Sequence, residues 1–398
     1  MLPTYEEALA AVVHSIEAQS ETELIPISSS IGRFLARNIV ADRDVPPFNR
    51  SQMDGYAVRA SEVKHGVKMN VIGQVAAGSM YKGEGLPMTC VSIATGAPVP
   101  DCYDAVVPHE KTDNGKIVVE FHCDDAKKYA CMHLQGVDAK EGDIVIPKHV
   151  KIAPQHVGIC ASVGVVQVPL LSMPKVIVIT SGDEVVAMDA TPQVYQIRNG
   201  NNPMVSQGLL AMGCDVIAQH HVQDDPVLTS ELMRETLDGR ADVVVTIGGI
   251  SAGERDYFPK AFATLGVDII VKGANIQPGK PVLIGKCKNT VVLALPGNPV
   301  SALVCCCIFG WPIVQSLLGS STRLPWQFAP LAHDVKPNPK RVAFRPCVLN
   351  DGKVHVPTWQ GSGDLLHTAE TNGLVQLPPS YSAIEVGTVL PCLAYPWL

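Results

Sequence analysis

Glycines, hydroxyl-bearing residues and acids gather directly after three apolar segments in the central part of the chain. These groups occupy residues 180–184 (TSGDE), 246–256 (TIGGISAGERD) and 295–302 (LPGNPVSA). Loops of this composition leave backbone N–H groups free to bind an anion, especially where the loop leads into a helix. The pattern predicts an anion site with the candidate residues Ser181, Gly182, Gly248, Gly249, Ser251, Gly297, Asn298 and Ser301.

None of the three loops carries a familiar nucleotide motif. The run GGISAG differs from GxGxxG, and GxxxxGK[ST] occurs nowhere in the sequence. The sequence therefore supports neither a dinucleotide site nor a P-loop. The prediction depends instead on position, because ligands of an open parallel sheet bind beyond the carboxyl ends of its strands.

Carboxylates accompany the same loops. A carboxylate repels a phosphate unless a cation lies between them, and Mg²⁺ takes both kinds of oxygen. The predicted Mg²⁺ ligands are Glu184, Asp225 and Asp256. For Asp224 and Asp225, just ahead of Pro226, a charge that stabilises a helix N-terminus is an equally good interpretation. Lys280 follows a Pro-Gly turn and could reach an oxyanion, although a solvated lysine is the alternative.

The texture of the sequence changes twice. A capping-box pattern at Thr4 and Glu7 predicts a helix to about residue 17. Short apolar runs with many turn residues then predict β-structure to about residue 168. From residue 172 to 320, strands alternate with helical patterns of 10–15 residues, which predicts an α/β domain with a mostly parallel sheet. Short strands return in residues 325–398.

Composition excludes several classes. A net charge of −7 argues against a nucleic-acid partner. The apolar run SALVCCCIFGWPIV is shorter than the roughly 20 residues of a membrane span, so it is predicted to be a core helix. The 12 cysteines include no CxxC pair and read as reduced core residues, which predicts a cytoplasmic protein.

Taken together, these motifs and several in the first half resemble one family. PPFNRSQMDGYAV (46–58), ATGAPVPDCYDAVVPHE (94–110) and GVDAKEGD (136–143) precede the SGDE, GGISAGERDYF, QPGKP and LPGNPVSA motifs. The whole set, in this order and over nearly the whole chain, resembles the MoeA family of molybdopterin molybdenumtransferases.

The resemblance implies a multidomain fold and a reaction. The fold would comprise an N-terminal linker domain (1–171) with an inserted β-rich domain (about 46–140), a three-layer α/β domain (172–320) and a C-terminal β-barrel domain (325–398). Two copies would form a homodimer. The implied reaction places molybdate on adenylylated molybdopterin, releases AMP and uses Mg²⁺. The adenylyltransferase that supplies the substrate is an implied partner, and no membrane partner is expected.

The family's functional residues transfer by motif. Its functional acids match Asp54, Asp138, Glu184, Asp256 and one of the pair at 224 and 225. Thr95 in TGAP matches a functional hydroxyl, and Lys280 matches a lysine of the anion site. The third loop adds Pro296 and Pro299, and the C-terminal region adds Arg345 and Ser362 as oxyanion contacts. By the resemblance, Asp54 and Thr95 would come from the partner subunit.

The sequence departs from the family pattern at a few positions. Gln277 stands where a basic residue usually precedes PGK, and Lys272 is a possible substitute; Asn49 and Arg50 replace Asp and Asn. Two other functions stay open. One is adenylyl transfer to molybdopterin, one step earlier, and the other is a scaffold of the same fold without turnover.

Overall fold

The computed structural model describes residues 1–250, 253 and 256–398. The chain divides into two compact units. Unit 1 comprises residues 1–23, 32–36 and 169–398, and unit 2 comprises residues 24–31 and 37–168. The chain passes between the units within β1 (Thr22–Pro26) and β11 (Gln167–Leu171) and around residues 31–37. Each unit is described separately below.

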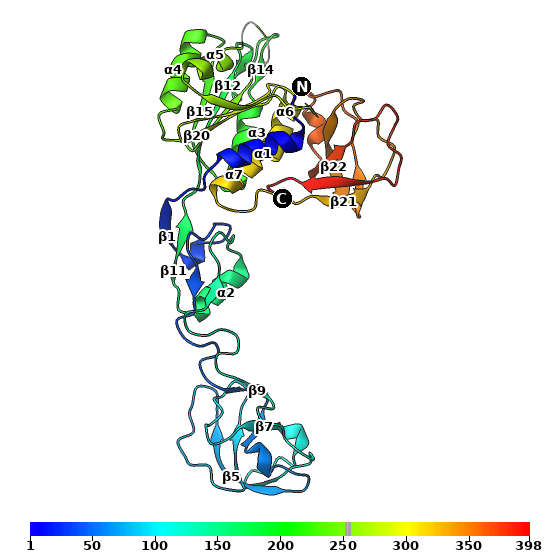
Figure 1. Ribbon diagram of the computed structural model, residues 1–398. Helices are drawn as coiled ribbons and strands as arrows, with labels where there is room; N and C mark the ends of the chain where they lie inside the picture. The colour runs from blue at the N-terminus through cyan, green and yellow to red at the C-terminus, as the bar shows by residue number, and fades with distance from the viewer. Residues whose placement is uncertain (251–252, 254–255) are drawn as a thin grey trace. The chain divides into compact units, whose positions relative to one another are not determined.

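A six-stranded sheet forms the centre of unit 1 (Figure 1). Its order is β15 (Asp215–Val222), β12 (Lys175–Ser181), β16 (Val243–Ile247), β20 (Thr290–Leu295), β19 (Leu283–Cys287) and β17 (Asp268–Lys272). The first four strands are parallel, and β19 and β17 are antiparallel additions at one edge. The three predicted anion loops follow β12, β16 and β20, which are adjacent parallel strands, so their carboxyl ends share one edge.

Helices cover both faces of this sheet. One face packs against α4 (Pro226–Thr236) and α5 (Phe258–Thr264), through a cluster that includes Met233, Phe258 and Phe262. The other face packs against α3 (Asn201–Ala211), α6 (Pro299–Cys305) and α7 (Trp311–Leu317), and α1 (Tyr5–Ser15) lies on the same side in contact with α7 and β17. Alternate residues of β12 enter opposite clusters, as period-two side-chain alternation requires. The three-layer α/β fold is confirmed.

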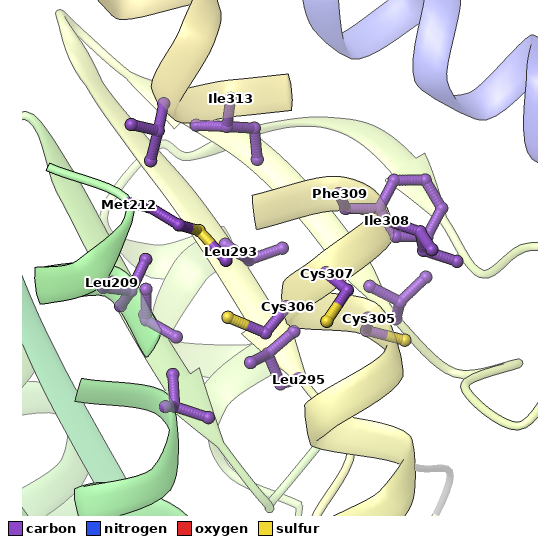
Figure 2. Packing of buried hydrophobic residues seen from close by; sticks show 14 of the residues in the cluster. Leu209, Met212, Leu293, Leu295, Cys305, Cys306, Cys307, Ile308, Phe309 and Ile313 are labelled. Carbon is purple, nitrogen blue, oxygen red and sulfur yellow. The ribbon is translucent and has the colours of Figure 1, made fainter. Parts of the chain in front are cut away.

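The cysteine-rich segment is the centre of this core. Figure 2 shows Cys305, Cys306 and Cys307 among Leu209, Leu293, Leu295 and other apolar side chains. All three are buried, and burial raises the pKa of the Cys306 thiol to about 12. Between α6 and α7, residues Cys306–Gly310 form one π-helical turn. The continuous helix Pro299–Leu317 is long and apolar enough to cross a membrane, but 94% of it is buried, as in a core helix.

A second sheet forms the C-terminal part of unit 1. Its order is β18 (Ile276–Gln277), β22 (Val342–Asn350), β24 (Gly373–Leu377), β25 (Val389–Ala394) and β21 (Gln327–Pro330), and β23 (Lys353–His355) pairs with β22. A 3₁₀ turn spans Leu366–Thr368. Strand β18 comes from the QPGKP segment of the α/β part, so that segment is hydrogen-bonded to the C-terminal sheet.

Unit 2 is built on a five-stranded sheet. Its order is β7 (Ala105–Pro108), β4 (Gly55–Val58), β6 (Thr89–Ile93), β5 (Lys68–Val75) and β8 (Val118–Glu120). The smaller elements are β2 (Ile39–Val40) with β10 (Ile144–Ile146), β3 (Arg50–Ser51) with β9 (Met132–His133), α2 (Pro154–Ser162), and 3₁₀ turns at Ile27–Ser29, Ala60–Glu62 and His109–Lys111. Gly55 permits the close pairing of β4 and β7, because a Cβ there would lie 2.1 Å from the Val107 carbonyl oxygen.

Candidate functional site

The three strand-end loops of unit 1 meet around one pocket of about 690 Å³. Its lining includes ten residues singled out from the sequence: Ser181, Gly182, Glu184, Gly248, Gly249, Asp256, Pro296, Gly297, Asn298 and Pro299. These residues come from three separate segments of the sequence, within 181–184, 248–256 and 296–299. The sheet topology brings them together, because β12, β16 and β20 are neighbours and end at the same edge.

Glycines let the loops approach each other. A Cβ at Gly248 would lie 3.2 Å from the Ser181 hydroxyl oxygen, and one at Gly249 would lie 3.0 Å from it. A Cβ at Gly297 would lie 3.4 Å from the Gly248 Cα. Gly248 and Gly249 also have φ values of +92° and +59°, a region that favours glycine. The absence of a Cβ at these glycines leaves their backbone open at the pocket, as in loops that bind anions through N–H groups.

Three carboxylates line the pocket: Glu184, Asp224 and Asp256. The Asp256 carboxylate accepts a 2.7 Å hydrogen bond from the Gly253 N–H. Ser251 lies outside the described residues. No group of three His, Cys, Asp or Glu in the described part of the chain is close enough to hold a metal alone. The donors suit Mg²⁺ in its usual protein setting, where one or two carboxylates act together with substrate phosphate oxygens.

Asp225 and Asp224 have different surroundings. The Asp225 carboxylate accepts from the N–H groups of Val227 (2.8 Å) and Leu228 (2.9 Å), so it is the N-cap of α4. Asp224 lines the pocket, and its own N–H donates to the Asp183 carboxylate at 3.0 Å. The helix-capping interpretation therefore describes Asp225, and Asp224 is the member of the pair at the pocket.

A polar segment that was not predicted from the sequence forms another wall of the pocket. Arg198, Asn199, Gly200 and Asn201 line the pocket together with Thr180. The Asn199 amide donates to the Thr180 hydroxyl at 2.8 Å, and the Asn201 amide donates to the Gly297 carbonyl at 2.7 Å. The available signal was the run RNGNN at the start of a helix, which places several amides at one point.

The third loop is fastened to the C-terminal region. The Asn298 amide donates to the Ser362 hydroxyl at 2.9 Å, and the Val300 N–H donates to the Ser362 carbonyl at 3.1 Å. Gly363 and Leu365 reach the pocket, whereas Ser362 is not part of its lining. Ser301 is buried within α6, also away from the lining.

Neither Lys280 nor Arg345, the two cations predicted for the site, is part of the pocket lining. Lys280 is exposed and directly precedes Pro281, which lines the pocket. Arg345 is buried with 9% of its surface exposed, and its guanidinium stacks on Trp359 at 3.8 Å. Its Nη2 donates to the Pro357 carbonyl at 3.5 Å, and its Nε has no partner among the described residues. Burial lowers the pKa of Arg345 to about 10. A buried cation with this little compensation is suited to receive an anion.

The other predicted residues belong to unit 2, where they form two local pairs. The Asp54 carboxylate accepts from the Thr95 N–H at 2.7 Å and from the Thr95 hydroxyl at 3.0 Å. These bonds, the backbone one first, lower the pKa of Asp54, with a smaller contribution from His109. The Asp138 carboxylate lies 2.9 Å from the His133 Nε2. Both acids are exposed and held by their neighbours.

The chain is similar to known proteins over most of its length. Three family models match: "MoeA N-terminal region (domain I and II)" at residues 3–164, "Probable molybdopterin binding domain" at 177–316 and "MoeA C-terminal region (domain IV)" at 329–395. The molybdopterin molybdenumtransferase 2 of Mycobacterium tuberculosis is 31% identical over 387 residues, which cover 92% of this chain and 93% of that protein.

Two further likenesses extend over the whole length. The molybdopterin molybdenumtransferase of Bacillus subtilis is 29% identical over 406 residues, covering 98% of this chain and 93% of the relative. The solved structure of a molybdopterin biosynthesis MoeA protein from Pyrococcus horikoshii superposes with a TM-score of 0.82 at 28% identity, and 99% of each chain is covered. On these grounds, the chain belongs to the MoeA family of molybdopterin molybdenumtransferases.

Proposed function

We propose that the protein transfers molybdenum from molybdate to adenylylated molybdopterin and releases AMP. The observation that carries the proposal is the pocket where three glycine-rich loops and three carboxylates meet, in a chain of this family. Cleavage of a phosphoanhydride needs hydrogen-bond donors to the phosphate oxygens and a positive charge that offsets theirs. The loops would supply the donors, and the carboxylates would hold the cation that supplies the charge.

In the proposed division of roles, Glu184 and Asp256 hold Mg²⁺, with Asp224 in the place first assigned to Asp225. Mg²⁺, when bound, polarises the phosphate oxygens and offsets their charge. The backbone of Gly248, Gly249 and Gly297 orients the phosphates. Two observations favour this exchange: the Asp225 Oδ1 is engaged in capping α4, and Asp224, not Asp225, lines the pocket.

The molybdate is proposed to bind at Lys280, Arg345 and Ser362. Arg345 supports this assignment most strongly, because its buried guanidinium has an unpartnered nitrogen and no carboxylate in ion-pair distance in the described part of the chain. An oxyanion there would supply the missing acceptor. Pro296, Asn298 and Pro299 line the pocket and would border the phosphates.

The proposed assembly is a cytoplasmic homodimer that receives its substrate from an adenylyltransferase. In it, Asp54 and Thr95 of one subunit would act on the pocket of the other, and Asp138 is a further functional acid. The proposed domains are 1–171 with an insert at about 46–140, 172–320 and 325–398. All 12 cysteines are free thiols, which supports a reducing compartment.

The central test is Asp256→Ala in the full-length protein. We expect AMP release from adenylylated molybdopterin to fall by roughly 10²–10³-fold, the usual loss when one electrostatic contact to a transition state is removed. Glu231→Gln, an exposed acid on α4, is the matched control and should keep the parent rate. An unchanged rate in Asp256→Ala would remove the assignment. ATP-dependent transfer of AMP onto molybdopterin by the parent protein would favour the earlier step instead.

A further inference from the structure

The charges that line the pocket are unequal. Glu184, Asp224 and Asp256 contribute carboxylates, and Arg198 is the only cationic side chain among the described residues of the lining. A phosphoanhydride brings further negative charge into the same space. Apart from a metal, the described wall therefore offers its phosphates one positively charged group, and the sequence motifs had not indicated it.

Neighbouring contacts fix the position of Arg198. It ends β14 (Ile197–Arg198), which pairs in parallel with β13 (Val185–Val186). On one side, the Ile197 N–H donates to the Glu184 carbonyl at 2.8 Å; on the other, the Asn199 N–H donates to the Val186 carbonyl at 2.8 Å. The backbone that carries Arg198 is thus tied to the residue that supplies a pocket carboxylate.

The side chain is oriented and only partly engaged. Its Nε donates to the Ala190 carbonyl at 3.1 Å. No other hydrogen bond or ion pair joins its guanidinium to a described residue, so Nη1 and Nη2 stay available at the exposed end. Two parallel N–H groups on a planar cation match two oxygens of one phosphate, a geometry that lysine does not reproduce.

We propose that Arg198 is a substrate-binding residue that holds a phosphate of a nucleoside phosphoanhydride in this pocket. The inference rests on the proposed function, since it assigns the phosphate end of the same substrate. Arg198 receives the phosphate oxygens at its two terminal nitrogens, while the glycine loops approach the phosphates with their backbone N–H groups. The bond from Nε to the Ala190 carbonyl leaves both terminal nitrogens of this pocket-lining side chain available.

The competing explanation is that Arg198 only anchors residues 187–196 through the Ala190 carbonyl. Two substitutions separate the explanations. Arg198→Gln keeps a donor for that carbonyl but removes the charge and the forked pair of donors. Arg198→Lys keeps the charge and removes the fork. Arg240→Gln is the control, because Arg240 is exposed, pairs with Asp238 and lies outside the pocket lining.

The experiment is calorimetric titration of the full-length protein with ADP and excess MgCl₂. We expect Arg198→Gln to weaken ADP binding by about 10- to 100-fold, the range of a charge-assisted contact, Arg198→Lys to fall between, and Arg240→Gln to match the parent. The salt dependence of binding should also weaken in Arg198→Gln. Parent-like ADP affinity in Arg198→Gln would overturn the proposal, as would a parent protein that does not bind ADP.

A second readout keeps this inference distinct from the proposed function. Arg198-dependent ADP binding without molybdate-dependent cofactor formation would leave Arg198 as a phosphate ligand and refute the function. Cofactor formation with an unchanged KM in Arg198→Gln would refute the role of Arg198 and leave the function standing.

Discussion

The Tyr5 hydroxyl donates a 3.2 Å hydrogen bond to the carbonyl oxygen of Ile308, 303 residues further along the chain. Pro312 lies four residues after Ile308 and has no N–H, so it cannot make the helical bond to that carbonyl. The π-helical turn Cys306–Gly310 occurs at this point. Tyr5 also packs edge-on against Phe309 and Phe344. Helix α1 thereby supplies a donor to a carbonyl that Pro312 cannot reach with an N–H group.

Tyr5→Phe keeps the ring and removes the donor, so the free energy of unfolding of unit 1 should fall by about 1–3 kcal/mol. Trp311, Trp326, Trp359 and Trp397 are the only tryptophans and all belong to unit 1, so urea unfolding followed by tryptophan fluorescence reports on that unit. Tyr381→Phe, at a side chain that is 78% exposed, should have no effect. A smaller loss from Tyr5→Phe in a Pro312→Ala background would confirm the link to proline.

The QPGKP turn depends on contact with the cysteine-rich helix. Gly279 has a φ of +104°, and a Cβ there would lie 2.3 Å from the Cys305 sulfur. Gly239 has a φ of +95° with open space around it, so Gly239→Ala measures backbone strain alone. We expect Gly279→Ala to be about 1–3 kcal/mol more destabilising than Gly239→Ala, the range for overpacking. Equal losses in fluorescence-monitored unfolding would show that the sulfur contact has no energetic weight.

Asp224 and Asp225 should separate function from stability. Asp225→Ala loses both capping bonds of α4 and should cost about 1 kcal/mol of unfolding free energy, with AMP release near the parent rate. Asp224→Ala should reduce AMP release strongly with little loss of stability. Unfolding curves and turnover measured on the same preparations check both, and the reverse outcome would restore Asp225 as the metal ligand.

Arg345 is expected to serve function at the expense of stability. Its buried guanidinium lacks a partner for Nε, and replacing a buried charge by an apolar side chain of similar length is often neutral or stabilising. Arg345→Met should therefore unfold at the same or a higher urea concentration. It should also need far more molybdate for half-maximal cofactor formation. Destabilisation without a change in molybdate requirement would indicate a purely structural arginine.

Thr95 should set the pH at which Asp54 ionises. The Thr95 N–H, its hydroxyl and a weaker effect of His109 lower the pKa of Asp54. Thr95→Val removes the hydroxyl bond alone, so the Asp54 pKa should rise toward its ordinary value and stay below it. Because the pKa of Asp54 is lower in the folded state than its ordinary value, the ionised carboxylate stabilises the fold at pH values above the ordinary pKa. That stabilisation disappears as the pH falls through the lowered pKa of the folded state. In Thr95→Val the folded-state pKa is higher, so the loss of stability should begin at a higher pH.

Carbon-13 NMR titration of the side-chain carboxyls measures this directly. Asp113 is the internal control, because the N–H groups of Glu120 and Gly115 lower its pKa and neither depends on Thr95. The acid limb of the pH profile of cofactor formation should move in the same direction as Asp54. An unmoved Asp54 resonance midpoint would show that the Thr95 hydroxyl does not influence this carboxylate.

The sequence alone determined the parallel part of the sheet and the place of the three predicted anion loops at its strand ends. Apolar strands that alternate with helical patterns, and the glycines and hydroxyl groups that follow them, are patterns within short stretches of sequence. Such patterns can be recognised without knowledge of the fold. The core position of Cys305–Cys307 was equally predictable from an uninterrupted apolar run. The family resemblance supplied Asp54, Thr95, Asp138 and Arg345, which composition would not have indicated.

Only the tertiary structure decided which side chains share a surface. Asp225 caps a helix and its neighbour Asp224 lines the pocket. Adjacent acids look alike in a sequence, so only the backbone conformation of the structure tells them apart. The pairing of β18 with β22 joins the QPGKP turn to the C-terminal sheet, and the sequence of neither strand indicates its partner. Arg198 enters the pocket because β13 and β14 pair beside it. Contacts between distant segments are set by packing and pairing energies of the whole fold, which no short stretch of sequence contains.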